Sequence, residues 1–91
     1  MPELVLGDCM EVLDKLKGQK FDMIFLDPPF ETDLGIKSIE RIVENNLLKE
    51  DGLIIFEHSS TRQFEYPQRL NVLDTKKYGY IIVDYLRYCD D

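Results

Sequence analysis

The residues best suited to chemistry form one short stretch, Asp27-Pro28-Pro29-Phe30, directly after the apolar run Met23–Leu26. An ionised aspartate offers only hydrogen-bond acceptors, the Pro28 carbonyl adds another, and Phe30 offers a flat ring. An exocyclic amino group on a flat heterocycle fits this set: the two acceptors can bind its two hydrogens, and the heterocycle can stack on the ring of Phe30. Such stacking contributes about 1–3 kcal/mol per base. The stretch therefore predicts a site that holds an amino nitrogen as a nucleophile. The alternative interpretation is a turn that only ends a strand.

The elements around this stretch would place it at the edge of a sheet. Met23–Leu26 is apolar on both faces, which is typical of a central parallel strand covered by helices. Two prolines cannot continue the strand, because proline lacks the N–H and has a fixed φ. The strand must end at Leu26 or Asp27, at the carboxyl end, where open α/β sheets bind ligands.

The rest of the chain predicts a single α/β domain over residues 1–91. Asp8 and Glu11 form a capping box, followed by a short helix that Gly18 ends. A second helix runs from Thr32 or Asp33 to about Asn46. The other expected elements are a strand at Leu4–Leu6, a turn at Lys49–Gly52, a buried strand at Leu53–Phe56, a loop at Thr61–Arg69, and a hairpin of Leu70–Thr75 and Tyr80–Tyr88 with its turn at Lys76–Gly79.

Two polar residues follow the strand at Leu53–Phe56. Glu57 lies at a carboxyl strand end, on the same rim as Asp27 if the sheet is parallel. His58 is the only histidine. A role as catalytic base is conceivable for it, because imidazole titrates near neutral pH. The competing interpretation is a solvated or structural histidine, since amino methylation can release its proton after transfer.

Composition is that of a soluble globular protein: 91 residues, 44% hydrophobic and 32% charged. No apolar run approaches the ~20 residues of a membrane span, and Met1-Pro2-Glu3 does not begin a signal peptide. Cys9 and Cys89 show neither metal spacing nor a disulfide pattern, so we expect free thiols, no metal and a cytoplasmic location. The net charge of −7 opposes nucleic-acid binding.

The stretch Asp27-Pro28-Pro29-Phe30 resembles the Asp/Asn-Pro-Pro-aromatic motif of S-adenosylmethionine-dependent amino methyltransferases. The flanking residues narrow the resemblance to the ribosomal RNA small subunit methyltransferase D family. They are Phe21-Asp22, Asp51-Gly52-Leu53-Ile54-Ile55 with Glu57, and Lys77-Tyr78-Gly79. The resemblance covers nearly the whole of this chain but only the C-terminal half of the proteins in that family. It implies methylation of a guanine N2 in small-subunit ribosomal RNA, with Asp27, Pro28, Pro29 and Phe30 as the catalytic residues.

The same resemblance implies a partial Rossmann-like class I methyltransferase sheet whose first half is missing. In the family, an acidic residue at the first strand end approaches the cofactor adenine, which assigns S-adenosylmethionine binding to Asp8 and its neighbour Cys9. Asp8 can equally be a plain helix cap. The family's glycine-rich loop is absent, because the five glycines are isolated from one another. We therefore expect the chain alone to be inactive.

The missing half also affects the sheet. In the family, two strands lie between those corresponding to Leu4–Leu6 and Met23–Leu26. Without them, either the first strand moves in beside Met23–Leu26, as a right-handed crossover allows, or two chains form a homodimer through the bare edge. Two other functions stay open: an inactive methyltransferase-like fragment or interaction module, and an amino methyltransferase acting on DNA or a small molecule.

Overall fold

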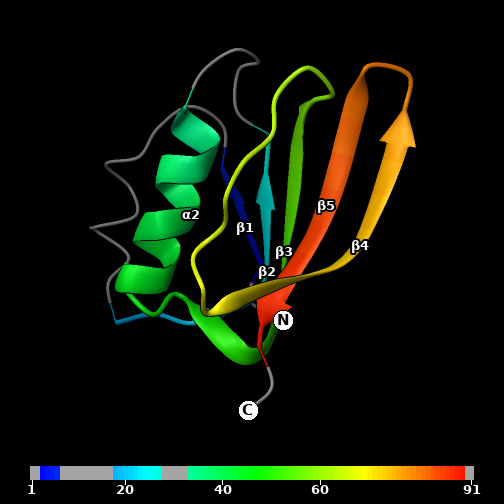
Figure 1. The fold of residues 1–91 in the computed structure, drawn as a ribbon. Helices are drawn as coiled ribbons and strands as arrows, with labels where there is room; N and C mark the ends of the chain where they lie inside the picture. Colours follow the sequence, from blue (N-terminus) through cyan, green and yellow to red (C-terminus); the bar gives the residue numbers. More distant parts are fainter. Residues whose placement is uncertain (1–2, 7–17, 28–32, 90–91) are drawn as a thin grey trace.

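The computed structural model describes residues 3–6, as backbone, and residues 18–27 and 33–89. Their strands form one sheet in the order β1-β2-β3-β5-β4 (Figure 1). The three parallel strands are β1 (Glu3–Leu6), β2 (Phe21–Leu26) and β3 (Leu48–Ser59). β5 (Ile81–Tyr88) pairs antiparallel with β3, and β4 (Leu70–Tyr78) pairs antiparallel with β5. The expected α/β sheet, with parallel strands and a C-terminal antiparallel hairpin, is confirmed.

The first strand lies directly beside the central one. Leu4 of β1 is opposite Ile24 of β2, and Leu6 is opposite Leu26, both in parallel register. This is the first of the two arrangements expected for the sheet, since β1 occupies the edge of β2 that would otherwise be bare. A homodimer through a sheet edge stays a prediction.

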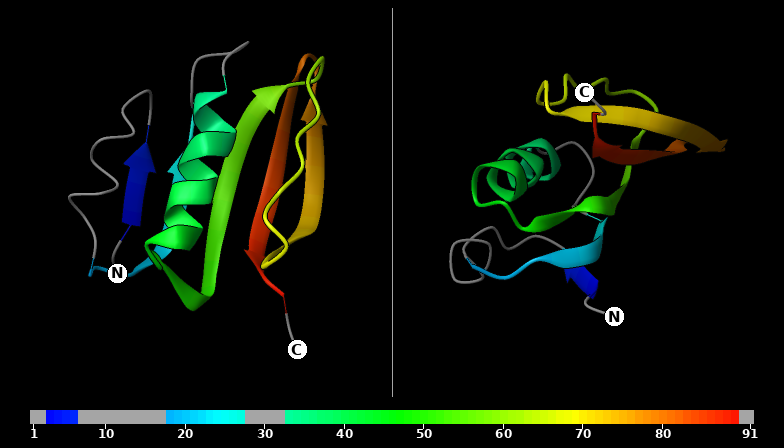
Figure 2. Two further views of the ribbon diagram at one scale, coloured as in Figure 1. Left: turned by 60° about the vertical axis from the view of Figure 1, so that its left-hand side comes forward. Right: turned by 90° about the horizontal axis from the view of Figure 1, so that it is seen from below.

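One face of the sheet carries the core. The helix α2 (Leu34–Glu44) and the segment 60–69 both lie over this face (Figure 2). Alternate residues of the strands point to it, because side chains of a strand alternate between faces. The helix contributes Ile39 and Ile42, both fully buried, at the three-residue spacing that places them on one side of a helix. The buried apolar residues of the sheet on this face are Ile24, Leu26, Ile54, Phe56 and Leu86.

The end of α2 sets how the chain enters β3. Asn46 has a φ of +54°, in the left-handed region. The N–H of Leu47 donates to the carbonyl of Ile42 at 3.0 Å, and the N–H of Asn46 donates to that of Val43 at 3.2 Å. This pair of bonds is a Schellman motif. Leu47 and Ile42 are both fully buried, so the motif ends the helix and anchors the following strand in the core.

The structure corrects the expected bounds of β3. The strand begins at Leu48, so Lys49–Gly52 is not a separate turn. Phe21 is paired with Leu48, but Met23, two residues later, is paired with Leu53, five residues later. The extra residues of β3 between these pairs form an irregularity in its pairing with β2. At its other end β3 continues past Phe56 to Ser59, because β5 supplies an antiparallel partner there. The position at which β3 ends therefore depends on its pairing with β5, a strand that is distant in sequence.

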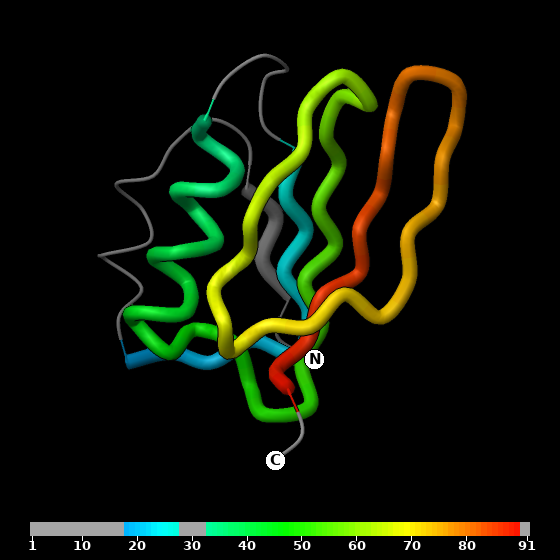
Figure 3. The backbone as a smooth tube through the Cα atoms, in the orientation of Figure 1, coloured from blue at the N-terminus to red at the C-terminus, as the bar shows by residue number. Residues whose placement is uncertain are grey.

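The hairpin β4–β5 is longer than expected (Figure 3). β4 extends to Tyr78, and only Gly79 and Tyr80 form the turn. Gly79 has a φ of +61°, a conformation that suits glycine. After Leu70 every residue of β4 is exposed, so this strand contributes little to the core.

Candidate active site at the carboxyl ends of the parallel strands

The candidate site is built where β2 ends beside the parallel strand β3, which continues to Ser59. Leu26 of β2 is paired with Phe56 of β3, and both are fully buried. Asp27 and Glu57 are the next residues on these strands, so the register places them side by side on one rim. Asp27 is exposed and Glu57 is half-buried. The parallel pairing confirms that the two residues are neighbours, whereas the expectation that Glu57 lies at a strand end is wrong, because β3 continues to Ser59.

The two carboxyl groups interact. Burial raises the pKa of Glu57 above its ordinary value of 4.5, and the charge of Asp27 and a hydrogen bond with it raise that pKa further. When both groups are ionised they only accept hydrogen bonds, so the pair can accept hydrogens from a ligand.

The other predicted site residues lie outside the described residues. Pro28, Pro29 and Phe30 fall in the range 28–32, and Asp8 and Cys9 fall in the range 7–17. Their roles stay predictions. The described backbone does show that β1 ends opposite the end of β2, with Leu6 paired to Leu26. The strand that precedes Asp8 thus ends on the same rim as the strand that precedes Pro28.

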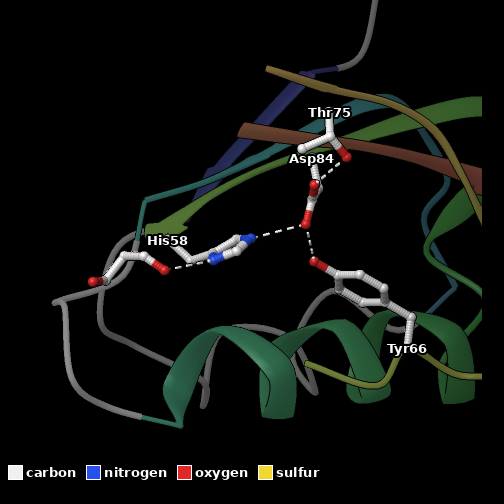
Figure 4. A network of polar contacts seen from close by, with 5 residues as sticks. His58, Tyr66, Thr75 and Asp84 are labelled. Atoms are coloured by element: carbon white, nitrogen blue, oxygen red, sulfur yellow. Dashed lines mark hydrogen bonds and ion pairs between the residues drawn. The ribbon is translucent and has the colours of Figure 1, made fainter. Parts of the chain in front are cut away.

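His58 is held in a buried network of polar contacts (Figure 4). Because successive side chains of a strand alternate between faces, it lies on the opposite face of β3 from Glu57. Its Nε2 lies 2.8 Å from Oδ2 of Asp84, and its Nδ1 lies 3.0 Å from the carbonyl oxygen of Ser59. Both of these partner atoms are hydrogen-bond acceptors. With both nitrogens engaged and 7% of its surface exposed, His58 is structural rather than a solvated or catalytic histidine.

Asp84 of β5 is the centre of this network. Besides His58, it accepts a hydrogen bond from the hydroxyl of Tyr66 and one from Thr75 at 2.7 Å. Burial by itself would raise the pKa of Asp84, but the three hydrogen bonds and the charge of His58 outweigh burial and lower it. Burial and the bond to Asp84 raise the pKa of Tyr66. The network joins β3, β4, β5 and the segment 60–69.

Aromatic rings and one ion pair hold the segment 60–69 over the strand ends. Phe56 packs against the rings of Phe64 and Tyr66, with centroids 5.4 and 6.3 Å apart. Arg62 lies over the ring of Phe64 and pairs with Asp33, the residue before α2. The segment therefore connects β3 to the start of α2.

Sequence reasoning missed most of this network. Thr61–Arg69 was expected to be a polar loop, and its two aromatic residues, Phe64 and Tyr66, were the available signal. No local pattern indicated that His58 would contact Asp84. The two residues are 26 positions apart and meet because β3 and β5 pair.

The described residues show neither a metal site nor a membrane span. No group of three His, Cys, Asp or Glu side chains converges within these ranges. None of the described helices has the length and apolar character needed to cross a bilayer. A cleft of about 530 Å³, lined by residues such as Lys20, Arg69 and Tyr88, lies at the amino ends of β2 and β3, away from Asp27.

Comparison with known proteins places the chain in a family. Residues 2–87 match the family described as Conserved hypothetical protein 95. Ribosomal RNA small subunit methyltransferase D of Haemophilus influenzae is 38% identical over 87 residues, covering 94% of this chain and 44% of that protein. An uncharacterized methylase of Rickettsia prowazekii is 30% identical over 73 residues, covering 80% of this chain and 31% of that protein.

The fold agrees with the sequence match. The crystal structure of a putative methylase from Haemophilus influenzae superposes with a TM-score of 0.74 at 32% identity, covering 86% of this chain and 51% of that one. The chain spans about half the length of this structure and less than half of the curated relatives named above. The resemblance based on Asp27–Phe30 and its flanking residues is thereby confirmed, and the chain belongs to the Conserved hypothetical protein 95 family.

Proposed function

We propose that the chain carries the target-base part of an S-adenosylmethionine-dependent N-methyltransferase that modifies N2 of a guanine in small-subunit ribosomal RNA. The observation that carries the proposal is Asp27 at the carboxyl end of β2, beside β3, in a chain of this family. The name of the Haemophilus influenzae relative supports ribosomal RNA as the substrate. The proposal includes a cytoplasmic location, where ribosomal RNA would be met.

The chemistry proposed for this rim is positioning. Asp27 accepts a hydrogen bond from one N2 hydrogen, the Pro28 carbonyl accepts the other, and Phe30 stacks on a base that has been flipped out of its helix. These contacts hold the nitrogen lone pair toward the methyl donor, and such positioning is a large part of catalysis in direct transfers. The nitrogen would form the new bond to the methyl carbon as the bond between that carbon and the donor sulfur breaks, leaving the donor as a thioether, and would afterwards release a proton to water. No histidine is required, in agreement with the buried position of His58.

The cofactor S-adenosylmethionine supplies an electrophilic methyl group when bound. Its adenine is assigned to Asp8 and Cys9, and the parallel pairing of β1 with β2 supports this, because β1 ends on the Asp27 rim. The described residues include no glycine-rich loop for the rest of the cofactor. The proposal is therefore limited to the adenine contact and the target-base pocket.

A second candidate is an inactive methyltransferase-like module that binds a partner. The isolated glycines and the net charge of −7 favour it, because RNA binders normally carry a basic surface. An amino methyltransferase acting on DNA or a small molecule has the same pocket chemistry, and the Asp-Pro-Pro-Phe stretch does not distinguish it from the first proposal.

Titration calorimetry with S-adenosylhomocysteine tests the proposal on the 91-residue chain. We expect binding by the wild-type chain and by Asp51→Ala, a control at an exposed position near the amino end of β3. Binding should be lost in Asp8→Ala. Absence of heat with the wild-type chain at millimolar ligand would contradict the proposed cofactor contact and favour the inactive module.

A further inference from the structure

The paired carboxyls at the rim impose a pattern on any ligand that binds there. Asp27 and Glu57 follow the paired residues Leu26 and Phe56 on neighbouring parallel strands, which lie about 4.8 Å apart. When ionised, both side chains only accept hydrogen bonds. A ligand that fits both must present two adjacent donors and must not direct a lone pair at either group.

Nucleic-acid bases differ in this pattern on their Watson–Crick edges. Guanine presents the N2 amino group and, next to it, the ring N1–H, so two adjacent positions donate. Adenine and cytosine present an amino group next to a ring nitrogen that accepts. A flipped base is read at this edge, and a ring acceptor placed against a carboxylate is repelled. Two carboxylates in a row therefore select guanine.

We infer that Glu57 is the residue that selects guanine at this rim, by accepting the ring N1–H while Asp27 accepts the adjacent N2 hydrogen. This inference rests on the proposed function and adds to it a specificity-determining residue. Asp27 alone would hold any exocyclic amino group, whereas the second carboxylate distinguishes guanine from the bases whose ring nitrogen is an acceptor.

The structure holds Glu57 firmly enough for this role. Its neighbours in β3, Phe56 and His58, are 0% and 7% exposed and point to the opposite face. Phe56 packs among aromatic rings, and His58 is hydrogen-bonded to Asp84 at 2.8 Å. Glu57 itself is paired with Val83 of β5, and the pairing of β3 with β2 ends one residue earlier, at Phe56. These contacts fix the backbone that carries Glu57.

The interaction of the two carboxyls in the free chain agrees with this inference. Burial raises the pKa of Glu57, and the charge of Asp27 and the hydrogen bond with it raise the pKa further. The pair is therefore unfavourable when both groups are ionised and no donor is present. Two donors from a base relieve this repulsion, whereas an acceptor adds to it.

The test compares three nucleoside monophosphates by NMR, following the side-chain carboxyl carbon signals of Asp27 and Glu57. Guanosine monophosphate carries both donors. 2-Aminopurine riboside monophosphate keeps the amino group but has an acceptor at N1. Inosine monophosphate keeps N1–H but lacks the amino group. Each ligand is titrated into the wild-type chain, into Glu57→Gln, and into the control Glu40→Gln, which changes an exposed carboxyl on α2.

We expect the wild-type chain and Glu40→Gln to bind guanosine monophosphate roughly 10- to 100-fold more tightly than the 2-aminopurine nucleotide, the factor for one charge-assisted hydrogen bond. Glu57→Gln should reduce this ratio about tenfold, because a glutamine amide can donate to the N1 acceptor. The ratio of guanosine to inosine monophosphate should change little in this variant, because the amino group is assigned to Asp27.

Two results would overturn the inference. One is a guanosine preference over 2-aminopurine that Glu57→Gln leaves unchanged. The other is no change in the Glu57 signal with guanosine monophosphate at millimolar concentration. A chain that binds S-adenosylhomocysteine but shows either result keeps the proposed function and loses this inference. A chain that shows the Glu57-dependent preference without binding S-adenosylhomocysteine keeps this inference and loses the proposed function.

Discussion

Replacing Asp84 should show how much of the stability depends on the buried network. The carboxylate accepts hydrogen bonds from His58, Tyr66 and Thr75 and is 7% exposed. Asp84→Ala leaves three donors without their partner. A donor left unsatisfied in the interior costs about 1–3 kcal/mol, so the loss of all three bonds should cost about 3–5 kcal/mol. We expect Asp84→Ala to lower the free energy of unfolding by about this amount, a large share of the stability of a small domain.

Asp84→Asn separates hydrogen bonding from charge. An amide oxygen in the place of Oδ2 can still accept from Tyr66 and His58, and the amide nitrogen can donate to the hydroxyl of Thr75, which also accepts. Only the charge is lost, and bonds to charged groups exceed neutral ones by about 1–1.5 kcal/mol. We expect a loss of about 1–2 kcal/mol. Asp74→Asn, at an exposed position of β4, is the control and should stay within about 0.5 kcal/mol of wild type.

Urea unfolding at a series of pH values measures these differences. The pKa of Asp84 is lowered in the folded chain from its ordinary value of 3.8. Its contribution should therefore be fully present above that value and be lost as pH falls through the lower folded value. The difference between wild type and Asp84→Asn should shrink in the same acidic range. An Asp84→Ala variant within about 1 kcal/mol of wild type at pH 7 would refute the energetic role given to this network.

Three further predictions follow from local geometry. Asp27→Asn should lower the pKa of Glu57 toward 4.5 without fully restoring it, because burial remains; NMR titration of Glu57 measures this, and an unchanged value would contradict the carboxyl contact. Gly52→Ala should cost about 1–3 kcal/mol in urea unfolding, because its Cβ would lie 2.9 Å from Cγ of Leu48; a neutral result would show that Leu48 can move. Asn46 has a φ of +54°, so the Asn46→Ala variant should be less stable than Asn46→Gly by about 1 kcal/mol. Equal thermal midpoints of the two variants would argue against the Schellman motif at the end of α2.

Local patterns in the chain were sufficient for the elements nearest the site. The apolar run before Asp27 and the two prolines after it indicated a strand that ends at a rim, and β2 does end at Leu26. The helix expected from Thr32 or Asp33 to about Asn46 is present as α2, and Ile39 and Ile42, three residues apart, form its core face. These signals are local, because the period of a helix or strand and the backbone limits of proline act within a few residues.

The strand bounds could not be obtained in the same way. The expected end of β3 at Phe56 and the expected turn at Lys49–Gly52 both came from polar residues that usually leave a sheet. In the structure β5 pairs with β3 as far as Ser59, which keeps polar residues in the strand. The length of a strand depends on its partner as well as on its own residues.

The sequence by itself determined the family, the α/β class and the place of Asp27 at a strand end, because these depend on short motifs and local periodicity. Only the tertiary structure decided that β1 lies beside β2, that Glu57 interacts with Asp27, and that His58 is buried against Asp84. The physical reason is that these contacts join segments far apart in the chain. Their formation depends on which strands pair and which face becomes buried, and no local pattern records that choice.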